Sequence, residues 1–288
     1  MTKIAYIGLG VMGFPMAGHL ASADYDLTVF NRTTSKAEQW VNKFANNFAT
    51  TPREACTDVD IAFICVGNDD DLRSVVFGDD GALAGLAEGS ILVDHTTASA
   101  EVAREIAIEA EKQGIAFIDA PVSGGQAGAE NAALTIMCGG QQDSFQRVET
   151  VMQTYGQRVM LMGDSGSGQL TKMVNQICIG GLVQALSEAV NFAQLAGLDT
   201  DKVFDVLSKG AAQSWQMENR AKTMCDGKFD YGFAVDWMRK DLSICLDEAK
   251  RNGAALPVSA LVDQFYRLVQ MKGGSRFDTS SLILNLKE

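Results

Sequence analysis

Two polar residues stand out in a helical stretch near the middle of the chain, GQLTKMVNQ at positions 168–176. Lys172 and Asn175 are three residues apart, so a helix places both on one face, among apolar neighbours. A buried lysine can donate a proton to a carbonyl oxygen, or accept one from an alcohol if its pKa falls from roughly 10.4. On an arbitrary helix such a pair is usually an ordinary surface pair, but this helix follows a predicted domain junction, where ligand pockets are common.

A second stretch, DAPVSGG at positions 119–125, follows a predicted strand and offers groups suited to a carboxylate. Ser123 supplies a hydroxyl, and Gly124 and Gly125 supply backbone N–H groups that no side chain shields. Ligands of α/β proteins bind at the carboxyl ends of the strands. We therefore expect these three residues to bind a small carboxylated substrate, although an ordinary glycine-rich loop would have the same composition.

A glycine-rich turn, G-x-G-x-x-G, links the first predicted strand to the first predicted helix. The first glycine makes the turn, the second lets a pyrophosphate approach the backbone, and the third lets the helix pack on the strand. The unpaired N–H groups of the helix N-terminus then face the phosphates. The alternative is a turn that only reverses the chain. We expect these residues to contact a dinucleotide: Gly8, Leu9, Gly10, Val11, Met12 and Gly13.

The end of the second predicted strand, VFNRTTSK at positions 29–36, lacks the acidic residue that grips the ribose in an NAD site. Arg32 can instead pair with a 2′-phosphate, and Asn31 and Thr33 can donate hydrogen bonds to it. Ser35, with Glu38 three residues later, predicts a capping box that opens the next helix. The alternative is that Asn31 only starts a turn and Arg32 is solvated. The missing acid and the arginine together predict NADP(H) rather than NAD(H).

The two histidines and six cysteines indicate little further chemistry. His19 is interpreted as a packed or surface residue, whereas His95 follows a strand near the expected cofactor and could line the site. The sequence has no HExxH pattern and no clustered ligands, so it predicts no metal site. The cysteines are scattered and form no C-x-x-C pair, which indicates buried thiols in a reducing compartment and hence a cytoplasmic protein.

The composition restricts the partners of this 288-residue chain. Its formal net charge of −12 disfavours binding to nucleic acid, because an anionic surface repels phosphate backbones. No apolar run reaches the roughly 18 residues that span a bilayer, so we expect no membrane partner. The N-terminal segment lacks the cleavage pattern of a signal peptide.

Strand and helix patterns alternate in the first half of the chain, and helical patterns alone follow. We expect strands at 3–8, 27–30, 60–66, 90–94, 115–120, 134–140 and 158–163, and helices at 12–23, 69–76, 100–113 and 142–153. Further helices are expected from about 167, and near 200–209, 214–225, 236–252 and 257–272. This predicts a Rossmann-like α/β domain with a parallel sheet (1–163), joined by a long helix to an all-α domain (164–288).

The chain resembles the β-hydroxyacid dehydrogenases over nearly its whole length. The resemblance rests on IGLGVMGFPMAGHL (7–20), DAPVSGGQAGAENAALTIMCGG (119–140), GSGQLTKMVNQ (166–176) and KDL (240–242). It implies the two-domain fold expected above and assembly into homodimers or homotetramers. It also implies interconversion of a small β-hydroxyacid and its semialdehyde or oxo acid, such as glyoxylate or succinic semialdehyde.

The same resemblance implies a role for individual residues. Lys172 is similar to the catalytic lysine, Asn175 to its partner in the substrate pocket, and Ser123, Gly124 and Gly125 to the carboxylate-binding loop. The residues that the resemblance assigns to the cofactor are Val66 and Gly67 after a strand, Thr96 and Thr97 beside the nicotinamide, Phe233 in a closing segment, and Lys240, a second lysine that Asp241 supports.

Two positions depart from the family pattern, and two other functions remain open. His95 stands where relatives often carry Met, and Ala132 stands where they usually carry Gly, at the edge of the carboxylate loop. An NAD-linked 3-hydroxyisobutyrate dehydrogenase would share most of these features. A non-catalytic dinucleotide-binding protein on the same fold would not need to keep Lys172, so the lysine favours an enzyme.

Overall fold

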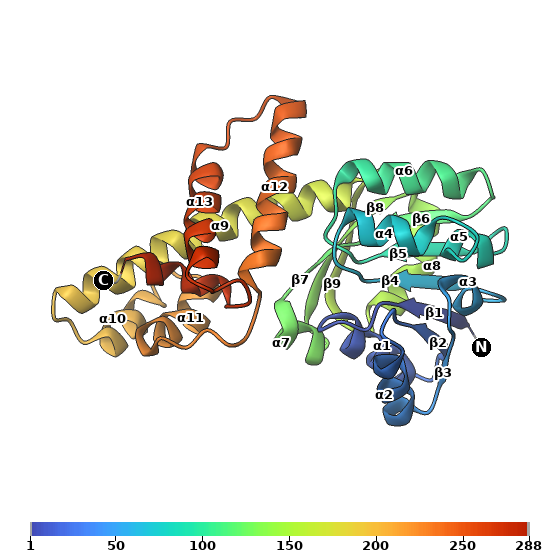
Figure 1. Ribbon diagram of the computed structural model, residues 1–288, viewed down its shortest axis with the longest axis horizontal. Coiled ribbons are helices and arrows are strands. Elements are labelled where there is room, and N and C mark those ends of the chain that lie inside the picture. The colour runs from blue at the N-terminus through green and yellow to red at the C-terminus, as the bar shows by residue number, and fades with distance from the viewer. Residues whose placement is uncertain (1, 287–288) are drawn as a thin grey trace. The chain divides into compact units, whose positions relative to one another are not determined.

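The computed structural model describes residues 2–286 of the chain (Figure 1). The chain divides into two compact units, residues 1–172 and residues 173–288, called unit 1 and unit 2 below. The domain boundary expected after residue 163 falls at the end of the last strand, whereas the units divide later, between Lys172 and Met173.

Unit 1 is built on a nine-stranded mixed sheet. Its strands run in the order β3-β2-β1-β4-β5-β6-β8-β7, and β9 also pairs with β8. The pairs from β3 to β6 are all parallel, as expected, but β8 lies antiparallel to both β6 and β7. The strand bounds are β1 (Lys3–Ile7), β2 (Asp26–Phe30), β3 (Asn47–Phe48), β4 (Ile61–Ile64), β5 (Ile91–Asp94), β6 (Ala116–Asp119), β7 (Val122–Ser123), β8 (Leu134–Gly140) and β9 (Gly156–Gly163).

Helices cover both faces of this sheet, with α1 and α2 on one side and α4 and α6 on the other (Figure 1). Successive strand residues point to opposite faces, so Tyr6 of β1 joins one apolar core while Ile7 joins the other. Both faces are therefore buried, as a parallel sheet requires. The helix bounds are α1 (Gly13–Ser22), α2 (Thr34–Phe44), α3 (Pro52–Ala55), α4 (Asp69–Val76), α5 (Ala82–Gly85), α6 (Ala100–Glu111), α7 (Gly125–Glu130) and α8 (Gln142–Met152).

Unit 2 consists of helices packed around their own apolar core. Val190 of α9, Leu242 of α12 and Tyr266 of α13 are among its fully buried members. The helix α9 begins in unit 1 and continues through unit 2. The helix bounds are α9 (Ser167–Leu195), α10 (Thr200–Leu207), α11 (Trp215–Asp226), α12 (Val235–Asn252), α13 (Pro257–Met271) and the 3-10 helix η1 (Thr279–Asn285).

Two glycines inside α9 face neighbouring helices of unit 2. A methyl group at Gly180 would lie 3.4 Å from Leu242 of α12, and one at Gly181 would lie 3.5 Å from Val258 of α13. Both are ordinary van der Waals distances. The glycines therefore lie at helix contacts, yet neither contact excludes a methyl group.

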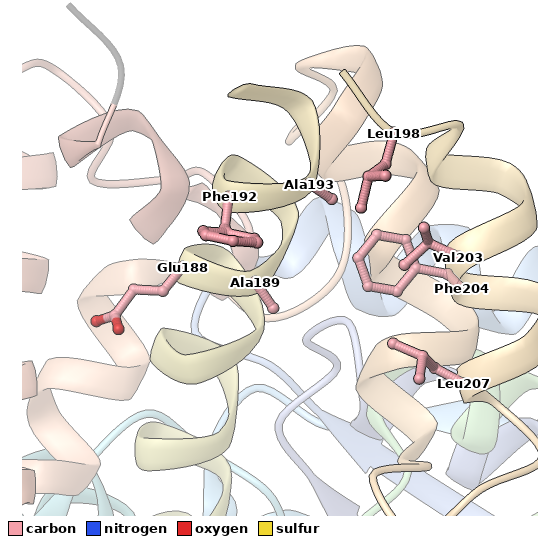
Figure 2. A pocket seen from close by; sticks show the side chains of 8 residues that line it. All are labelled: Glu188, Ala189, Phe192, Ala193, Leu198, Val203, Phe204 and Leu207. Carbon is pink, nitrogen blue, oxygen red and sulfur yellow. The ribbon is translucent and has the colours of Figure 1, made fainter. Parts of the chain in front are cut away.

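A groove in unit 2 is lined almost wholly by apolar side chains (Figure 2). It measures about 360 Å³ and lies between the last turns of α9 and the short helix α10. Phe192 on its α9 side is 71% exposed, and none of the residues of α10 is buried. The lining residues are Glu188, Ala189, Phe192, Ala193, Leu198, Val203, Phe204 and Leu207.

Within the part of the chain that the structure describes, α9 alone is long and apolar enough to cross a membrane. Its mean hydropathy reaches 1.2 over an 18-residue window, and 44% of that window is buried. The core helix of a soluble protein meets the same criterion, so this is weak evidence for a membrane span. The sequence prediction of membrane spans did not include this helix, because polar residues such as Gln184 interrupt its apolar positions.

Candidate functional site

The glycine turn between β1 and α1 is shaped by close approaches that only glycine permits. Gly8 has a φ of +95°, and a methyl group at this position would overlap the carbonyl of Cys65. A methyl group at Gly13 would overlap the carbonyl of Gly8, whereas nothing lies within 4 Å of the corresponding position at Gly10. No side chain caps α1 and no acidic residue lies in its first turn. The turn thus leaves room and a positive helix end for a phosphate group.

Asn31 connects the end of β2 to this turn. Its Oδ1 accepts a hydrogen bond from the backbone N–H of Leu9 at 2.9 Å, and its Nδ2 donates to the carbonyl of Thr33 at 3.0 Å. Both atoms of the amide therefore have backbone partners. The sequence predicted that Asn31 would bind a phosphate, and the structure gives it the additional task of holding the turn.

Arg32 extends into solvent beside the same strand end. Its side chain is 84% exposed, and its Nη1 lies 3.1 Å from Oδ1 of Asp71 in α4. An exposed ion pair of this kind contributes little to stability, so a phosphate can compete for the guanidinium.

The predicted capping box at Ser35 is wrong: α2 begins at Thr34, and its N-cap residue Thr33 makes no side-chain cap hydrogen bond.

The loops after β4 and β5 are joined through Thr96. Its Oγ1 accepts a hydrogen bond from the backbone N–H of Val66 at 3.0 Å, and its own N–H donates to Oδ1 of Asp94 at 2.9 Å. Burial raises the pKa of the Asp94 carboxyl to about 7, against the opposing effect of the hydrogen bonds from Thr96. Gly67 and Thr97 lie in the same two loops and are partly exposed.

His95 is buried, and its ring links two segments of unit 1. Its Nδ1 lies 2.6 Å from the carbonyl of Ala120, and its Nε2 lies 2.8 Å from the hydroxyl of Tyr155. A carbonyl can only accept, so Nδ1 carries the proton and Nε2 accepts from Tyr155. Burial lowers the pKa of His95 to about 4, which keeps the ring neutral. The histidine therefore joins β6 to the segment before β9, and both ring nitrogens are occupied.

The candidate carboxylate loop lies where β7 leads into α7. Ser123 pairs with Thr135 of β8, while Gly124 and Gly125 have φ values of +135° and +61°. These backbone conformations favour glycine and let the chain turn sharply after Ser123. Ala132 has a φ of +53°, which explains why a glycine would suit that position better.

The start of α9 is fixed to the carboxyl end of the sheet by two buried side chains that sequence reasoning missed. Asp119, the last residue of β6, accepts hydrogen bonds from the N–H of Gly166 at 2.7 Å and of Gln169 at 2.9 Å. The Gln169 side chain donates to the carbonyl of Thr96 at 2.7 Å and accepts from the N–H of Ala98 at 3.1 Å.

The carboxylate of Asp119 thus satisfies backbone donors that a helix start leaves without partners. Burial raises the pKa of Asp119 to about 6, although these N–H groups oppose the shift. Both Asp119 and Gln169 belong to quoted sequence motifs, but nothing in the sequence connects residues 50 positions apart.

Lys172 follows Gln169 by three residues, so both lie on the same face of α9. Its side chain is 8% exposed. Side chains on a helix lean toward the N-terminal end, which directs the lysine back over the turn that carries Gln169. Lys172 therefore lies on the α9 face that Gln169 joins to Thr96, in the loop after β5.

The predicted residues of unit 2 form two groups. Asn175 donates to Oε1 of Gln176 at 2.7 Å, Gln176 donates to Oδ2 of Asp241 at 2.6 Å, and Lys240 lies 3.0 Å from Oδ1 of Asp241. This network connects the two residues that the sequence assigned to substrate and cofactor. Phe233 lies elsewhere, and its backbone N–H donates to the buried carboxylate of Asp278 at 3.0 Å.

No group of three or more His, Cys, Asp or Glu residues suited to a metal occurs between residues 2 and 286. The carboxyl ends of the strands of unit 1 carry a lysine, hydroxyls and backbone donors, and the glycine turn has room for the phosphates of a dinucleotide. This combination suits transfer of a hydride and a proton.

Comparison with known proteins agrees with this geometry. The profile described as the NAD-binding domain of 6-phosphogluconate dehydrogenase matches residues 3–163. A profile described as the NAD-binding domain of NADP-dependent 3-hydroxyisobutyrate dehydrogenase matches residues 166–286.

Individual relatives cover nearly the whole chain. An uncharacterized oxidoreductase of Shewanella frigidimarina is 62% identical over 100% of this chain and 99% of its own. The 2-hydroxy-3-oxopropionate reductase of Escherichia coli is 33% identical over 99% of this chain and 97% of its own. The solved structure of Mycobacterium tuberculosis 3-hydroxyisobutyrate dehydrogenase with L-serine has a TM-score of 0.90 at 27% identity, covering 100% of both chains.

Proposed function

Because the chain belongs to the β-hydroxyacid dehydrogenase family of NAD(P)-binding oxidoreductases, we propose that it reduces a small carboxylated aldehyde or oxo acid with NADPH. Glyoxylate and succinic semialdehyde are the substrates that we favour. The observation that carries the proposal is the position of Lys172, on the α9 face that Gln169 fixes to the Thr96–Ala98 loop.

Each part of unit 1 has a task in this reaction. The glycine turn and Arg32 would hold the dinucleotide, which supplies the hydride when it is bound. Ser123, Gly124 and Gly125 would hold the substrate carboxylate through a hydroxyl and backbone N–H groups. Lys172 would donate a proton to the carbonyl oxygen, and in the reverse direction its neutral form would take the alcohol proton.

Two features support NADP(H) over NAD(H). The end of β2 carries Asn31 and Arg32 in place of a carboxylate, and the exposed guanidinium is available for a 2′-phosphate. The profile that matches the second half of the chain is described by an NADP-dependent enzyme. An NAD-linked 3-hydroxyisobutyrate dehydrogenase is the second candidate, since it would use the same lysine and carboxylate loop.

The groove of unit 2 supports a further proposal, that the protein assembles into a homodimer or homotetramer. Phe192 and Leu195 project from the same region that carries the groove, so two copies can fill each other's groove. None of the six cysteines forms a disulfide, which supports a cytoplasmic location, although the prediction that they are buried is wrong for Cys178, which is exposed, and for Cys65 and Cys225, which are partly exposed. The net charge of −12 supports partners other than nucleic acid.

One assay tests the substrate and the cofactor together. Oxidation of NADPH is followed at its absorbance band with glyoxylate, succinic semialdehyde, tartronate semialdehyde and methylmalonate semialdehyde, and each reaction is repeated with NADH. We expect turnover with at least one substrate and a higher kcat/KM with NADPH. Turnover with NADH alone would favour the NAD-linked candidate, and no turnover with any of them would favour a non-catalytic protein.

Arg32→Ala tests the cofactor assignment on its own. Loss of a charge-assisted contact to the 2′-phosphate should weaken NADPH binding by roughly 10-fold or more and leave NADH binding within about 2-fold. The dissociation constants can be measured by quenching of protein fluorescence. Lys43→Ala, at the other end of α2, serves as the control for loss of one positive charge. Equal loss of both cofactors in Arg32→Ala would contradict the assignment.

A further inference from the structure

We propose that Gln169 and Gln176 are positioning residues that fix the rotation of α9 and thereby hold Lys172 in its reactive orientation. The proposal rests on the proposed role of Lys172 as proton donor. It concerns how the chain keeps this lysine in place, for which sequence motifs gave no indication.

The spacing of the three residues places them on one face of the helix. Gln169, Lys172 and Gln176 are separated by three and four residues, which on an α-helix brings all three within roughly 60° of one another. The lysine is flanked by one amide on its N-terminal side and one on its C-terminal side. A small rotation of the helix would displace all three together.

Gln169 joins α9 to the loop after β5. Both ends of its amide are used, by donation to the carbonyl of Thr96 and acceptance from the N–H of Ala98. Its own backbone N–H is held by Asp119. The side chain is fully buried, so rupture of these bonds would leave polar groups without water. This end of the helix therefore has one favourable register against the loop after β5.

Gln176 joins α9 to α12 within unit 2. Its Nε2 donates to Oδ2 of Asp241 at 2.6 Å, and its Oε1 accepts from Asn175 at 2.7 Å. The side chain is 2% exposed, and its Nε2 also lies 3.9 Å from the sulfur of Met238. A hydrogen bond to a carboxylate is stronger than one between neutral groups, so this contact fixes the helix against α12.

A lysine side chain has four rotatable bonds and does not keep a fixed direction by itself. The two amides fix the rotation of the helix, and this rotation sets the direction of the Cα–Cβ bond of Lys172. Misplacement of a catalytic group by about 1 Å can cost roughly 100-fold in rate. The glutamines are thus expected to affect kcat through the lysine.

The test is a set of substitutions to methionine, which has a similar length but no hydrogen-bonding amide. Gln169→Met and Gln176→Met should each lower kcat by roughly 10- to 100-fold, with KM for the aldehyde changed by less than about 3-fold. Gln184→Met is the matched control, because Gln184 is a buried amide of the same helix whose side chain donates only to Glu188, one turn away. This control should retain kcat within about 2-fold.

A double-mutant cycle distinguishes positioning from a general loss of folding. If the glutamines act through the lysine, Gln169→Met should lower the residual rate of a Lys172→Ala enzyme by less than about 2-fold. Gln169→Asn and Gln176→Asn variants keep the amide on a shorter side chain, and together with melting temperatures they cover the case in which a methionine variant does not fold.

Each outcome bears on a different claim. Full additivity with Lys172→Ala, or a kcat in both glutamine variants equal to that of Gln184→Met, would overturn the positioning role. Wild-type turnover in Lys172→Ala would instead overturn the proposed function, whatever the glutamine variants show.

Discussion

The two units differ in where they bury ionisable groups and in how many large apolar side chains they expose. Both units bury ionisable groups, but in unit 1 Asp94, His95 and Asp119 all lie at or just beyond the carboxyl ends of the strands, whereas Asp278 of unit 2 is paired with Arg220. Unit 2 exposes more large apolar groups, including Phe192 and Leu195, although it is the shorter unit. Burial of ionisable groups destabilises a fold unless the geometry compensates, and exposure of apolar groups forgoes stabilisation. The difference makes unit 1 the place to test for chemistry and unit 2 the place to test for association.

The largest effect should follow from removal of the lysine at the end of unit 1. Lys172→Ala is expected to lower kcat by roughly 10³-fold, because general acid catalysis commonly contributes a factor of this size. The dissociation constant of NADPH should stay within about 3-fold, since the glycine turn and Arg32 are untouched. Steady-state kinetics and cofactor titration measure both, and the exposed Lys202→Ala of unit 2 is the control. A kcat within 10-fold of the wild type would place the chemistry elsewhere.

The next effect concerns the buried carboxyl of Asp94. Its pKa is raised to about 7, so the folded protein binds a proton more tightly than the unfolded chain does. The stability that Asp94 contributes is therefore present below about pH 4 and is lost as pH rises from about 4 to about 7.

Asp94→Asn removes this titration. Relative to the wild type, the free energy of unfolding of the variant should rise between pH 4.5 and 7.5, by an amount on the order of 2 to 4 kcal/mol. Urea unfolding at several pH values measures the difference. A difference that does not change with pH would show that the buried carboxyl does not titrate in this range.

A smaller effect is expected on self-association, and it should differ between exposed apolar residues of unit 2 and of unit 1. Phe192→Asp in the groove of unit 2 is expected to weaken self-association by roughly 100-fold, because a buried charge in an apolar interface has no partner. Sedimentation should then show a larger fraction of 30.9 kDa monomer. Ile108→Asp, at an exposed position of α6 in unit 1, is the matched control and should leave the assembly unchanged. If both substitutions weakened self-association equally, the exposed apolar side chains of unit 2 would have no special part in assembly.

The smallest effect concerns glycines of α9 that lie in different units. Gly180→Ala should raise the free energy of unfolding by about 0.5 to 1 kcal/mol, since the added methyl meets Leu242 at an ordinary distance and alanine favours the helix. Gly168→Ala in unit 1 should destabilise the protein, because its methyl would overlap the carbonyl of Met137. Thermal unfolding of both variants measures the difference, and stabilisation by both would show that the start of α9 is not tightly held.

The sequence predicts the long elements well because their apolar residues repeat. The helix Asp69–Val76 and the strand Leu134–Gly140 match the predicted bounds, and α9 begins at the predicted residue. Short elements were missed, including β3 and β7 with two residues each and α3 and α5 with four, because a few residues show no period. The antiparallel direction of β8 could not be predicted, because a strand that is buried on both faces has the same apolar sequence pattern whichever way it runs.

The glycine turn was predictable because its spacing alone indicates a tight connection from strand to helix. The close approaches at Gly8 and Gly13 agree with such a turn, whereas the contacts of individual turn residues with a cofactor stay predictions. The roles of Asp119, Gln169 and Gln176 could not be predicted, because each depends on a partner distant in the sequence. The roles of Lys172, Ser123 and Lys240 in catalysis and binding stay predictions.

The hydrogen bond between Asn31 and Leu9 has a consequence for the evolution of cofactor preference. Only the oxygen of the amide holds the glycine turn, and an aspartate carboxylate would present an oxygen in the same place. A change from Asn to Asp would therefore add the acid that grips a ribose and keep the bond to the phosphate turn, at the cost of the bond from Nδ2 to the carbonyl of Thr33. Selection can alter the choice of coenzyme at this position while the scaffold beneath it is preserved.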